Sequence, residues 1–197
     1  MSDLSQAIEI IRLGGVVIYP TETLYGLGCD ATNEAALRRL FEIKGRALTQ
    51  PPPVLIAGVA QLEMLVAEVP VTAHELMEKH WPGALTLVLP AQNGLSSLLT
   101  SEPNGAKTIG VRESGHAIAR ALCEGAGVPL VATSANFSGA TGNAAAPRTL
   151  DDIPAEFKAL VDMVLDGGAV GGAPSTVVDC TGAELRVLRH GAIEIAY

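Results

Sequence analysis

The sequence has few of the features that would indicate a disulfide framework or a structural zinc site. Its 197 residues include three cysteines, Cys29, Cys123 and Cys180, an odd count without CxxC spacing. We therefore expect all three to be small buried residues in a reducing compartment. Aromatic residues reach only 4%, so aliphatic side chains must supply most of the packing.

Membrane and export signals are also missing. No apolar run approaches the roughly eighteen residues that a transmembrane helix needs, and the N-terminus lacks the apolar stretch of a signal peptide. We expect a cytoplasmic protein without membrane contact. The net charge of −8 argues against a protein that coats nucleic acid, because such proteins are usually basic.

The common nucleotide and nucleophile motifs are absent as well. The sequence has no GxxxxGK[ST], no GxGxxG after a strand and no GxSxG. Its four histidines lack metal-ligand spacing, so we predict no metal site built by the protein itself. A nucleotide enzyme with this sequence would have to hold phosphate in another way.

Hydrophobic residues make up 48% of the chain, which is enough for a substantial core, and the length favours a single domain over residues 1–197. Periodicity predicts helices at 4–13, 33–44, 59–68, 72–80 and 116–126. Strands are expected at 15–20, 53–58, 84–90, 108–112, 128–133, 162–168, 175–180 and 184–191. This alternation predicts an α/β fold with a mixed sheet, because the short late connections suit antiparallel neighbours.

Four polar segments interrupt this pattern: "PTETLYGLG" (20–28), "KGR" (44–46), "TSANFSG" (133–139) and "GAPSTVVDC" (172–180) with "LRHG" (188–191). Each has a purely local explanation. Turn hydroxyls can bond their own backbone, a helix-end Lys44 can snorkel, and Arg189 can be an exposed strand-end residue. Each also suits a ligand site, since small polar residues at the ends of buried strands are where open α/β sheets bind ligands.

Taken in order, "YPTETLYGLGCDA", "KGR", "WPGALTLVL", "TIGVR", "TSANFSG", "PSTVVDC" and "LRHG" closely resemble the YrdC/Sua5 family, from about residue 8 to residue 193. The resemblance is to the short YrdC-type form without the C-terminal Sua5 domain. It implies a twisted mixed sheet with flanking helices around a concave, positively lined cavity. Family members are L-threonylcarbamoyladenylate synthases, which make threonylcarbamoyl-AMP and pyrophosphate from L-threonine, bicarbonate or CO2, and ATP.

The resemblance also implies partners and site residues. The product passes to a tRNA threonylcarbamoyl-transferase complex that modifies adenosine 37 of tRNAs reading ANN codons, and tRNA itself binds weakly or indirectly. Mg2+ is expected mainly on the phosphates. The matching threonine-binding positions are Thr21, Arg112, Ser134 and Ser175. The catalytic cation pair is Lys44 and Arg46, and the ATP contacts are Lys44, Thr108, Asn136 and Arg189.

One stretch departs from the family pattern, and two other functions stay open. The usual proline after Arg46 is Ala47, and Pro52 and Pro53 replace an apolar pair after Pro51, which puts backbone contacts to substrate in 47–53 in doubt. An RNA-binding or ribosome-maturation module is the first alternative, although the charge balance opposes it. A carbamoyl-transfer domain of hydrogenase maturation is the second, although its zinc-type cysteines are missing.

Overall fold

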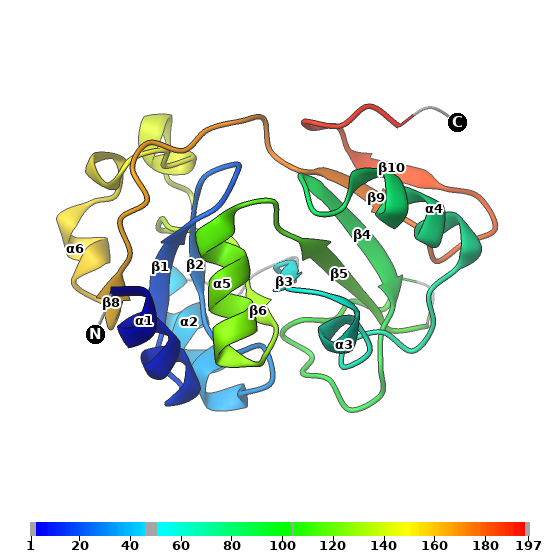
Figure 1. Ribbon diagram of the computed structural model, residues 1–197, viewed down its shortest axis with the longest axis horizontal. Helices are drawn as coiled ribbons and strands as arrows, with labels where there is room; N and C mark the ends of the chain where they lie inside the picture. The colour runs from blue at the N-terminus through cyan, green and yellow to red at the C-terminus, as the bar shows by residue number, and fades with distance from the viewer. Residues whose placement is uncertain (1–2, 46–50, 104, 196–197) are drawn as a thin grey trace.

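The structure is a computed structural model that describes residues 3–45, 51–103 and 105–195. Its strands form two sheets with helices around them (Figure 1). The four-stranded sheet has the order β7-β2-β1-β8, with β1 Val17–Pro20, β2 Tyr25–Gly28, β7 Thr133–Ser134 and β8 Met163–Val164. In this sheet β2 is antiparallel to both of its neighbours, whereas β8 lies parallel to β1.

The six-stranded sheet has the order β10-β9-β4-β5-β3-β6. It contains β3 Val54–Ile56, β4 Leu85–Pro90, β5 Thr108–Glu113, β6 Leu130–Val131, β9 Thr176–Asp179 and β10 Arg186–Arg189. The pairs β3–β5 and β4–β9 are parallel and the other pairs are antiparallel. The prediction of an α/β fold with mixed pairing is therefore confirmed.

The helices are α1 Asp3–Arg12, α2 Glu34–Lys44, α3 Val59–Leu62, α4 Val71–His80, α5 Ala117–Ala126 and α6 Ala155–Lys158, with two 3-10 turns at Gly142–Ala145 and Leu150–Asp152. Helix α1 lies against α5, beside the four-stranded sheet, and α3 and α4 lie with the six-stranded sheet (Figure 1). Asn33 caps α2, because its side chain accepts hydrogen bonds from the amides of Ala35 and Ala36. Gly45 ends α2 in the left-handed conformation, with φ 76°.

Three details of the prediction were wrong. The helix expected at 59–68 ends at Leu62. The residues Tyr25–Gly28 form a strand that pairs with β1, so the polar segment 20–28 is a hairpin. The strand expected at 128–133 is divided, because β6 pairs with β3 in one sheet and β7 pairs with β2 in the other. Because the chain passes from one sheet to the other between β6 and β7, the strands form two sheets and not the single sheet that we expected.

Two hydrophobic clusters of the described residues connect the two sheets. The larger one contains Ile18 and Leu27 from the four-stranded sheet and Val54, Leu87 and Val111 from the six-stranded sheet. All three cysteines are buried and unpaired, as predicted. No helix in the described ranges is long and apolar enough to cross a membrane.

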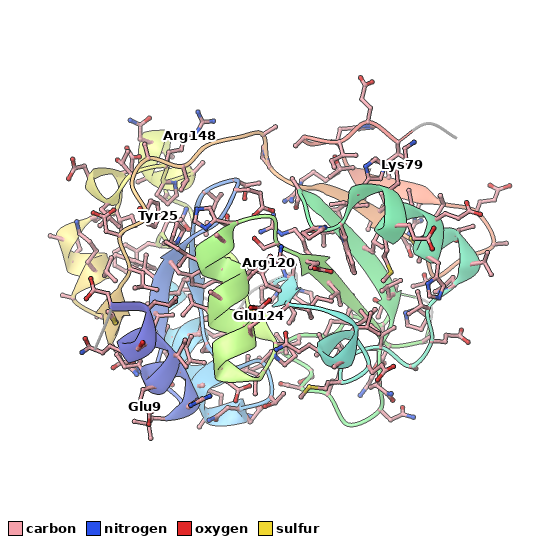
Figure 2. The ribbon with its side chains drawn as sticks, viewed as in Figure 1. Glu9, Tyr25, Lys79, Arg120, Glu124 and Arg148 are labelled. Carbon is pink, nitrogen blue, oxygen red and sulfur yellow. The ribbon has the colours of Figure 1, made fainter. Side chains whose placement is uncertain are left out.

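A long segment, residues 165–175, runs from β8 on one sheet to β9 on the other (Figure 1). Its start is held by Tyr25, whose hydroxyl donates to the carbonyl of Gly168 at 2.7 Å and accepts from the amide of Gly167 at 3.0 Å (Figure 2). Its middle is held by a backbone hydrogen bond from Val170 to Arg148. The segment delivers Pro174 and Ser175 to the site described next.

Candidate functional site

The turn of the first hairpin satisfies its hydroxyl groups locally and still faces a cavity. Thr21 Oγ1 accepts from the amides of Thr23 and Leu24 and donates to the carbonyl of Leu24 at 2.6 Å. These bonds are the local explanation that the sequence offered for the segment. Thr21 and Thr23 also line a cavity of about 350 Å³, so the local explanation and the ligand explanation are compatible.

This smaller cavity brings together all four residues predicted to bind threonine. Thr21 comes from the hairpin turn, Arg112 from β5, Ser134 from β7 and Ser175 from the residue before β9. Their positions in the sequence span more than 150 residues, so the fold, and not local sequence, assembles them. A guanidinium among three hydroxyl groups suits a small molecule that carries both a carboxylate and a hydroxyl.

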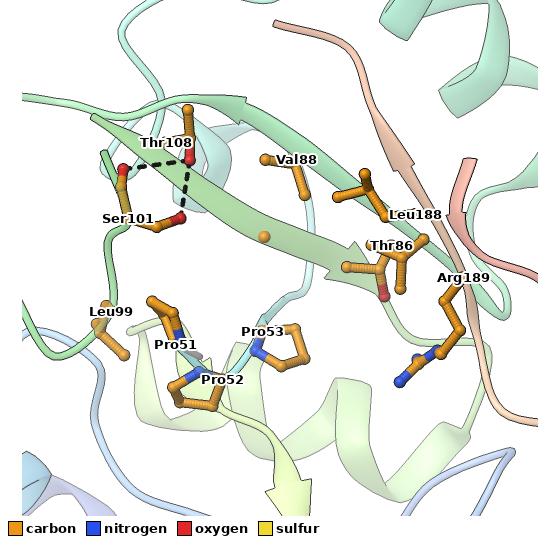
Figure 3. Close-up of a pocket in the computed structure, with 12 residues that line it drawn as sticks. Pro51, Pro52, Pro53, Thr86, Val88, Leu99, Ser101, Thr108, Leu188 and Arg189 are labelled. Atoms are coloured by element: carbon orange, nitrogen blue, oxygen red, sulfur yellow. Dashed lines mark hydrogen bonds between the residues drawn. The ribbon is translucent and has the colours of Figure 1, made fainter. Parts of the chain in front are cut away.

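A larger cavity of about 580 Å³ adjoins the first and holds two predicted ATP contacts, Thr108 and Arg189 (Figure 3). Its other lining is mainly apolar and includes Pro51, Pro52, Pro53, Val88, Leu99, Val177 and Leu188. Arg189 and Pro53 line both cavities, which therefore meet at these two residues. The proline run that departs from the family pattern forms part of the wall, whereas Ala47 lies outside the described residues.

The boundary between the cavities is a hydrogen-bonded group around Ser175. Arg189 donates from Nε and Nη2 to the carbonyl of Ser175, at 3.1 and 2.9 Å, and from Nη2 to Ser175 Oγ at 2.9 Å. The hydroxyls of Ser175 and Thr86 lie 2.9 Å apart. Desolvation of its guanidinium and the nearby charge of Arg112 both lower the pKa of Arg189. Two cations at one boundary favour an anion between them.

Lys44 is buried, with 3% of its surface exposed, so the snorkelling explanation is wrong. Its ammonium donates to the carbonyls of Ser134 and Asn136, both at 2.8 Å, and to Asn136 Oδ1 at 2.7 Å. Asn136 Oδ1 also accepts from Ser134 Oγ at 2.7 Å. Neither Lys44 nor Asn136 is among the described residues that line the two cavities. Arg46, the other predicted catalytic cation, lies outside the described residues.

Sequence reasoning assigned no role to three residues that lie at or beside the predicted site. Glu22 Oε1 lies 3.2 Å from Arg112 Nη1, and the hydroxyl of Ser114 donates to Glu22 Oε2. The Thr108 hydroxyl lies 3.1 Å from that of Ser101, which also lines the larger cavity (Figure 3). The sequence did contain a signal for Glu22, because a carboxylate between two threonines in "PTET" is unusual for a simple turn. No local pattern marked Ser101 or Ser114.

The described part of the chain has no cluster of three or more His, Cys, Asp or Glu side chains that could hold a metal ion. The charged groups at the cavities are chiefly arginines, so the arrangement is suited to binding anions. Two adjoining cavities with cations at their boundary can hold two anionic molecules in contact.

Comparison with known proteins decides the family. The Sua5/YciO/YrdC family model, described as "Telomere recombination", matches residues 9–191. The chain belongs to the Sua5/YciO/YrdC family. This membership confirms the resemblance that the ordered motifs indicated.

The family relatives include enzymes named threonylcarbamoyl-AMP synthase. The Bacillus subtilis protein of that name is 39% identical over 192 residues, which cover 96% of this chain and 54% of the relative. The Vibrio cholerae serotype O1 protein is 35% identical over 194 residues, which cover 97% of this chain and 98% of the relative. Among solved structures, Pyrococcus abyssi Sua5 complexed with L-threonine matches with a TM-score of 0.86 and 38% identity, over 95% of this chain and 54% of that one.

The chain thus spans about half the length of the B. subtilis and P. abyssi members of the family and nearly the whole length of the V. cholerae member. The matched part contains every segment that builds the two cavities, since these lie between Thr21 and Arg189.

Proposed function

We propose that the protein is an L-threonylcarbamoyladenylate synthase, a nucleotidyltransferase that converts L-threonine, bicarbonate or CO2, and ATP to threonylcarbamoyl-AMP and pyrophosphate. The observation that carries the proposal is the meeting of two cavities at Arg189. The smaller is lined by all four predicted threonine-binding residues, and the larger by two predicted ATP contacts. Residues 1–197 act as one YrdC-like domain around a concave, positively lined site.

In this reaction the threonine carboxylate binds Arg112, and its side-chain hydroxyl bonds Thr21, Ser134 or Ser175. ATP occupies the larger cavity with its phosphates toward Arg189. A carbamate oxygen attacks the α-phosphorus and pyrophosphate leaves, so the protein's task is to position two anions and to stabilise charge. Mg2+ enters as part of the substrate, chelated by the phosphates, because the described residues offer no carboxylate cage for it.

Lys44 and Arg46 are the proposed catalytic cations. The hydrogen bonds of Lys44 to Ser134 and Asn136 hold these two residues in place, and the same ammonium is proposed to contact the substrate. To contact a carbamate or phosphate oxygen, the ammonium must exchange one of these acceptors. The proposed contact of Lys44 and the placement of Ser134 and Asn136 therefore depend on each other.

The proposed place of the reaction is the cytoplasm, and the proposed consumer of the product is a tRNA threonylcarbamoyl-transferase complex. An acyl-adenylate analogue of this kind is an activated donor, so the protein that uses it must transfer the threonylcarbamoyl group to a nucleophile. The adenosine 37 amine of tRNAs reading ANN codons is the proposed acceptor. tRNA itself contacts this protein weakly or only through the complex.

The test is pyrophosphate release from ATP in the presence of bicarbonate with either L-threonine or L-valine. Valine has nearly the shape of threonine but leaves the hydroxyl groups of the smaller cavity unpaired, so we expect threonine to react on the order of 100-fold faster or more. ATP binding without amino acid serves as the control. Equal rates with the two amino acids would refute the assignment of the smaller cavity to threonine.

A further inference from the structure

Two buried polar atoms beside the smaller cavity lack a hydrogen-bond partner among the described residues. They are Glu22 Oε1 and Arg112 Nε. Arg112 is 5% exposed and lines the cavity, and its Nη1 lies 3.2 Å from Glu22 Oε1. A buried polar atom without a hydrogen-bond partner destabilises the protein. An acceptor oxygen of Glu22 and a donor nitrogen of Arg112 both lack such a partner, which indicates a ligand that carries a positive and a negative group.

The surrounding residues fix the Glu22 carboxylate and leave its Oε1 without a hydrogen-bond donor among the described residues. Glu22 lies between Thr21 and Thr23, which both line the cavity. Ser114 donates its hydroxyl to Oε2 and accepts the amide of His116 at 3.2 Å. Because Ser114 occupies Oε2 and Arg112 makes only an ionic contact with Oε1, the second oxygen keeps its capacity to accept a hydrogen bond.

We propose that Glu22 Oε1 binds the ammonium group of the amino-acid substrate and accepts its proton when the carbamate forms. This inference rests on the proposed function, and it assigns the smaller cavity to a zwitterion. Arg112 takes the carboxylate and Glu22 takes the ammonium on the adjacent carbon. Glu22 is then a catalytic residue in addition to the cation pair.

The proton balance follows from the substrates. The ammonium transfers one proton to the Glu22 carboxylate, which frees the nitrogen lone pair. The amine then attacks the bicarbonate carbon, an N–C bond forms, and a C–O bond breaks. The leaving hydroxyl takes a second proton from nitrogen and departs as water. The carbamate carries one negative charge, and the Glu22 carboxyl is neutral at this stage and does not repel it.

Several charged and titratable groups face Glu22. Arg112 of β5 faces it directly, and Arg189 of β10 acts on Arg112 from the cavity boundary. Burial lowers the pKa of His116 at the start of α5, although the charge of Glu22 partly opposes this shift. Burial raises the pKa of Tyr19 on β1, which keeps its phenol neutral. Arg112 is the cation that already contacts Glu22, and in the proposal the substrate ammonium is a second cation at the same carboxylate.

The first test is calorimetric binding of L-threonine to Glu22→Gln without ATP or bicarbonate, beside the matching hydroxy acid, in which a hydroxyl replaces the ammonium. The substitution keeps the size of the side chain but removes its charge. We expect 10- to 100-fold weaker threonine binding with the hydroxy acid nearly unaffected. Glu68→Gln, an exposed glutamate on the loop before α4, is the matched control and should bind both as the wild type does.

If Glu22→Gln weakened the binding of threonine and of the hydroxy acid equally, Glu22 would only position Arg112. If it weakened the binding of neither, Glu22 would have no role. Either result would overturn the inference. A wild type that binds threonine but releases no pyrophosphate with ATP and bicarbonate would refute the proposed function and leave the ammonium contact standing. A wild type that binds neither ligand would contradict both.

The second test is the pH profile of threonine-dependent pyrophosphate release. As pH rises from about 7 to 9, more of the free amino acid carries a neutral amine, since α-amino groups titrate near pH 8. The defect of Glu22→Gln in kcat/KM should therefore shrink with rising pH. A defect of the same size at both pH values would contradict proton acceptance by Glu22.

Discussion

Lys44 is the residue whose setting differs most from what its sequence position suggested. Its place on the apolar face of α2 marked it as unusual, but the three acceptors that hold its ammonium lie 90 and 92 residues away. The pattern of one helix cannot reveal such acceptors. Lys44 therefore anchors the segment 134–136, which carries one predicted threonine contact and one predicted ATP contact.

Lys44→Met should lower the free energy of unfolding by at least about 2 kcal/mol, because the buried carbonyl of Asn136 would lose the ammonium that donates to it. Urea unfolding measures the loss. Lys79→Met, at an exposed position on α4, is the matched control and should change stability by less than about 0.5 kcal/mol. Equal unfolding midpoints for Lys44→Met and the wild type would refute the anchoring role.

Arg189 and Ser175 illustrate what could be predicted for single residues. The resemblance assigned Arg189 to ATP and Ser175 to threonine, as separate contacts. In the structure they are bonded to each other and separate the two cavities. The sequence could identify the participants, but their contact depends on β10 pairing with β9, which no local motif encodes.

At the scale of elements, packing against the β1–β2 hairpin explains one of the two glycines that follow "TETLY". A Cβ on Gly28 would lie 2.3 Å from the carbonyl oxygen of Val131 and 2.7 Å from the ring of Tyr19. A Cβ on Gly26 would meet nothing closer than 3.6 Å. Close approach of β6 to β2, and not a ligand, therefore demands a glycine at position 28.

The two glycines give a matched pair of variants. Gly28→Ala should destabilise the protein by about 1–3 kcal/mol or more, since the new methyl group overlaps backbone that cannot move freely. Gly26→Ala should stay within about 1 kcal/mol of the wild type. Thermal or urea unfolding compares them, and similar losses for both variants would contradict the close packing of β6 on β2.

A second element-level contact ties α2 to the start of β1. Arg39 Nη2 donates to Asp162 Oδ1 at 2.9 Å, and Asp162 Oδ2 accepts the amide of Val16 at 2.8 Å. The hydrogen bond from Arg39 is the main reason that the pKa of Asp162 lies below its ordinary 3.8, with burial opposing it. Because the folded pKa is lowered, the contribution is present above pH 3.8 and is lost as pH falls through the folded pKa.

Asp162→Asn should therefore cost about 0.5–1 kcal/mol at pH 7, a modest amount because both side chains are more than a third exposed and solvent screens the pair. The cost should shrink as pH falls through the lowered pKa of folded Asp162, because the carboxyl loses its charge there. Urea unfolding at several pH values measures it, with exposed Asp151→Asn as the control. A cost that persists unchanged under acid conditions would show that the ion pair is not its source.

For the whole molecule, the sequence predicted the α/β class, most elements and the family, but not the division into two sheets. That division arises at residues 130–134, where β6 and β7 follow each other directly and pair with different sheets. Hydrophobic periodicity reports burial and not the identity of the partner strand. The smaller cavity forms where the two sheets meet, since its lining comes from strands of both, so the sequence could name its residues but could not place them.

The charge of the whole chain makes a prediction about tRNA. The net charge is −8, and surface arginines pair with glutamates of their own helices. Arg12 lies 4.0 Å from Glu9, and Arg120 lies 3.9 Å from Glu124 on α5 (Figure 2). We expect bare tRNA to bind only in the non-specific range, micromolar or weaker at physiological salt. Fluorescence anisotropy in increasing salt measures this. Tight, salt-resistant binding would instead favour the RNA-module alternative.

Under the proposed function the two adjoining cavities join an amino acid to a nucleotide, and the products of the reaction test this directly. The measurement is mass spectrometry after incubation with ATP, 13C-labelled bicarbonate and 15N-labelled L-threonine. We expect an adenylate that carries both labels, together with an equal amount of pyrophosphate. Hydrolysis of ATP without a doubly labelled adenylate, or no reaction of ATP at all, would contradict this role of the cavities.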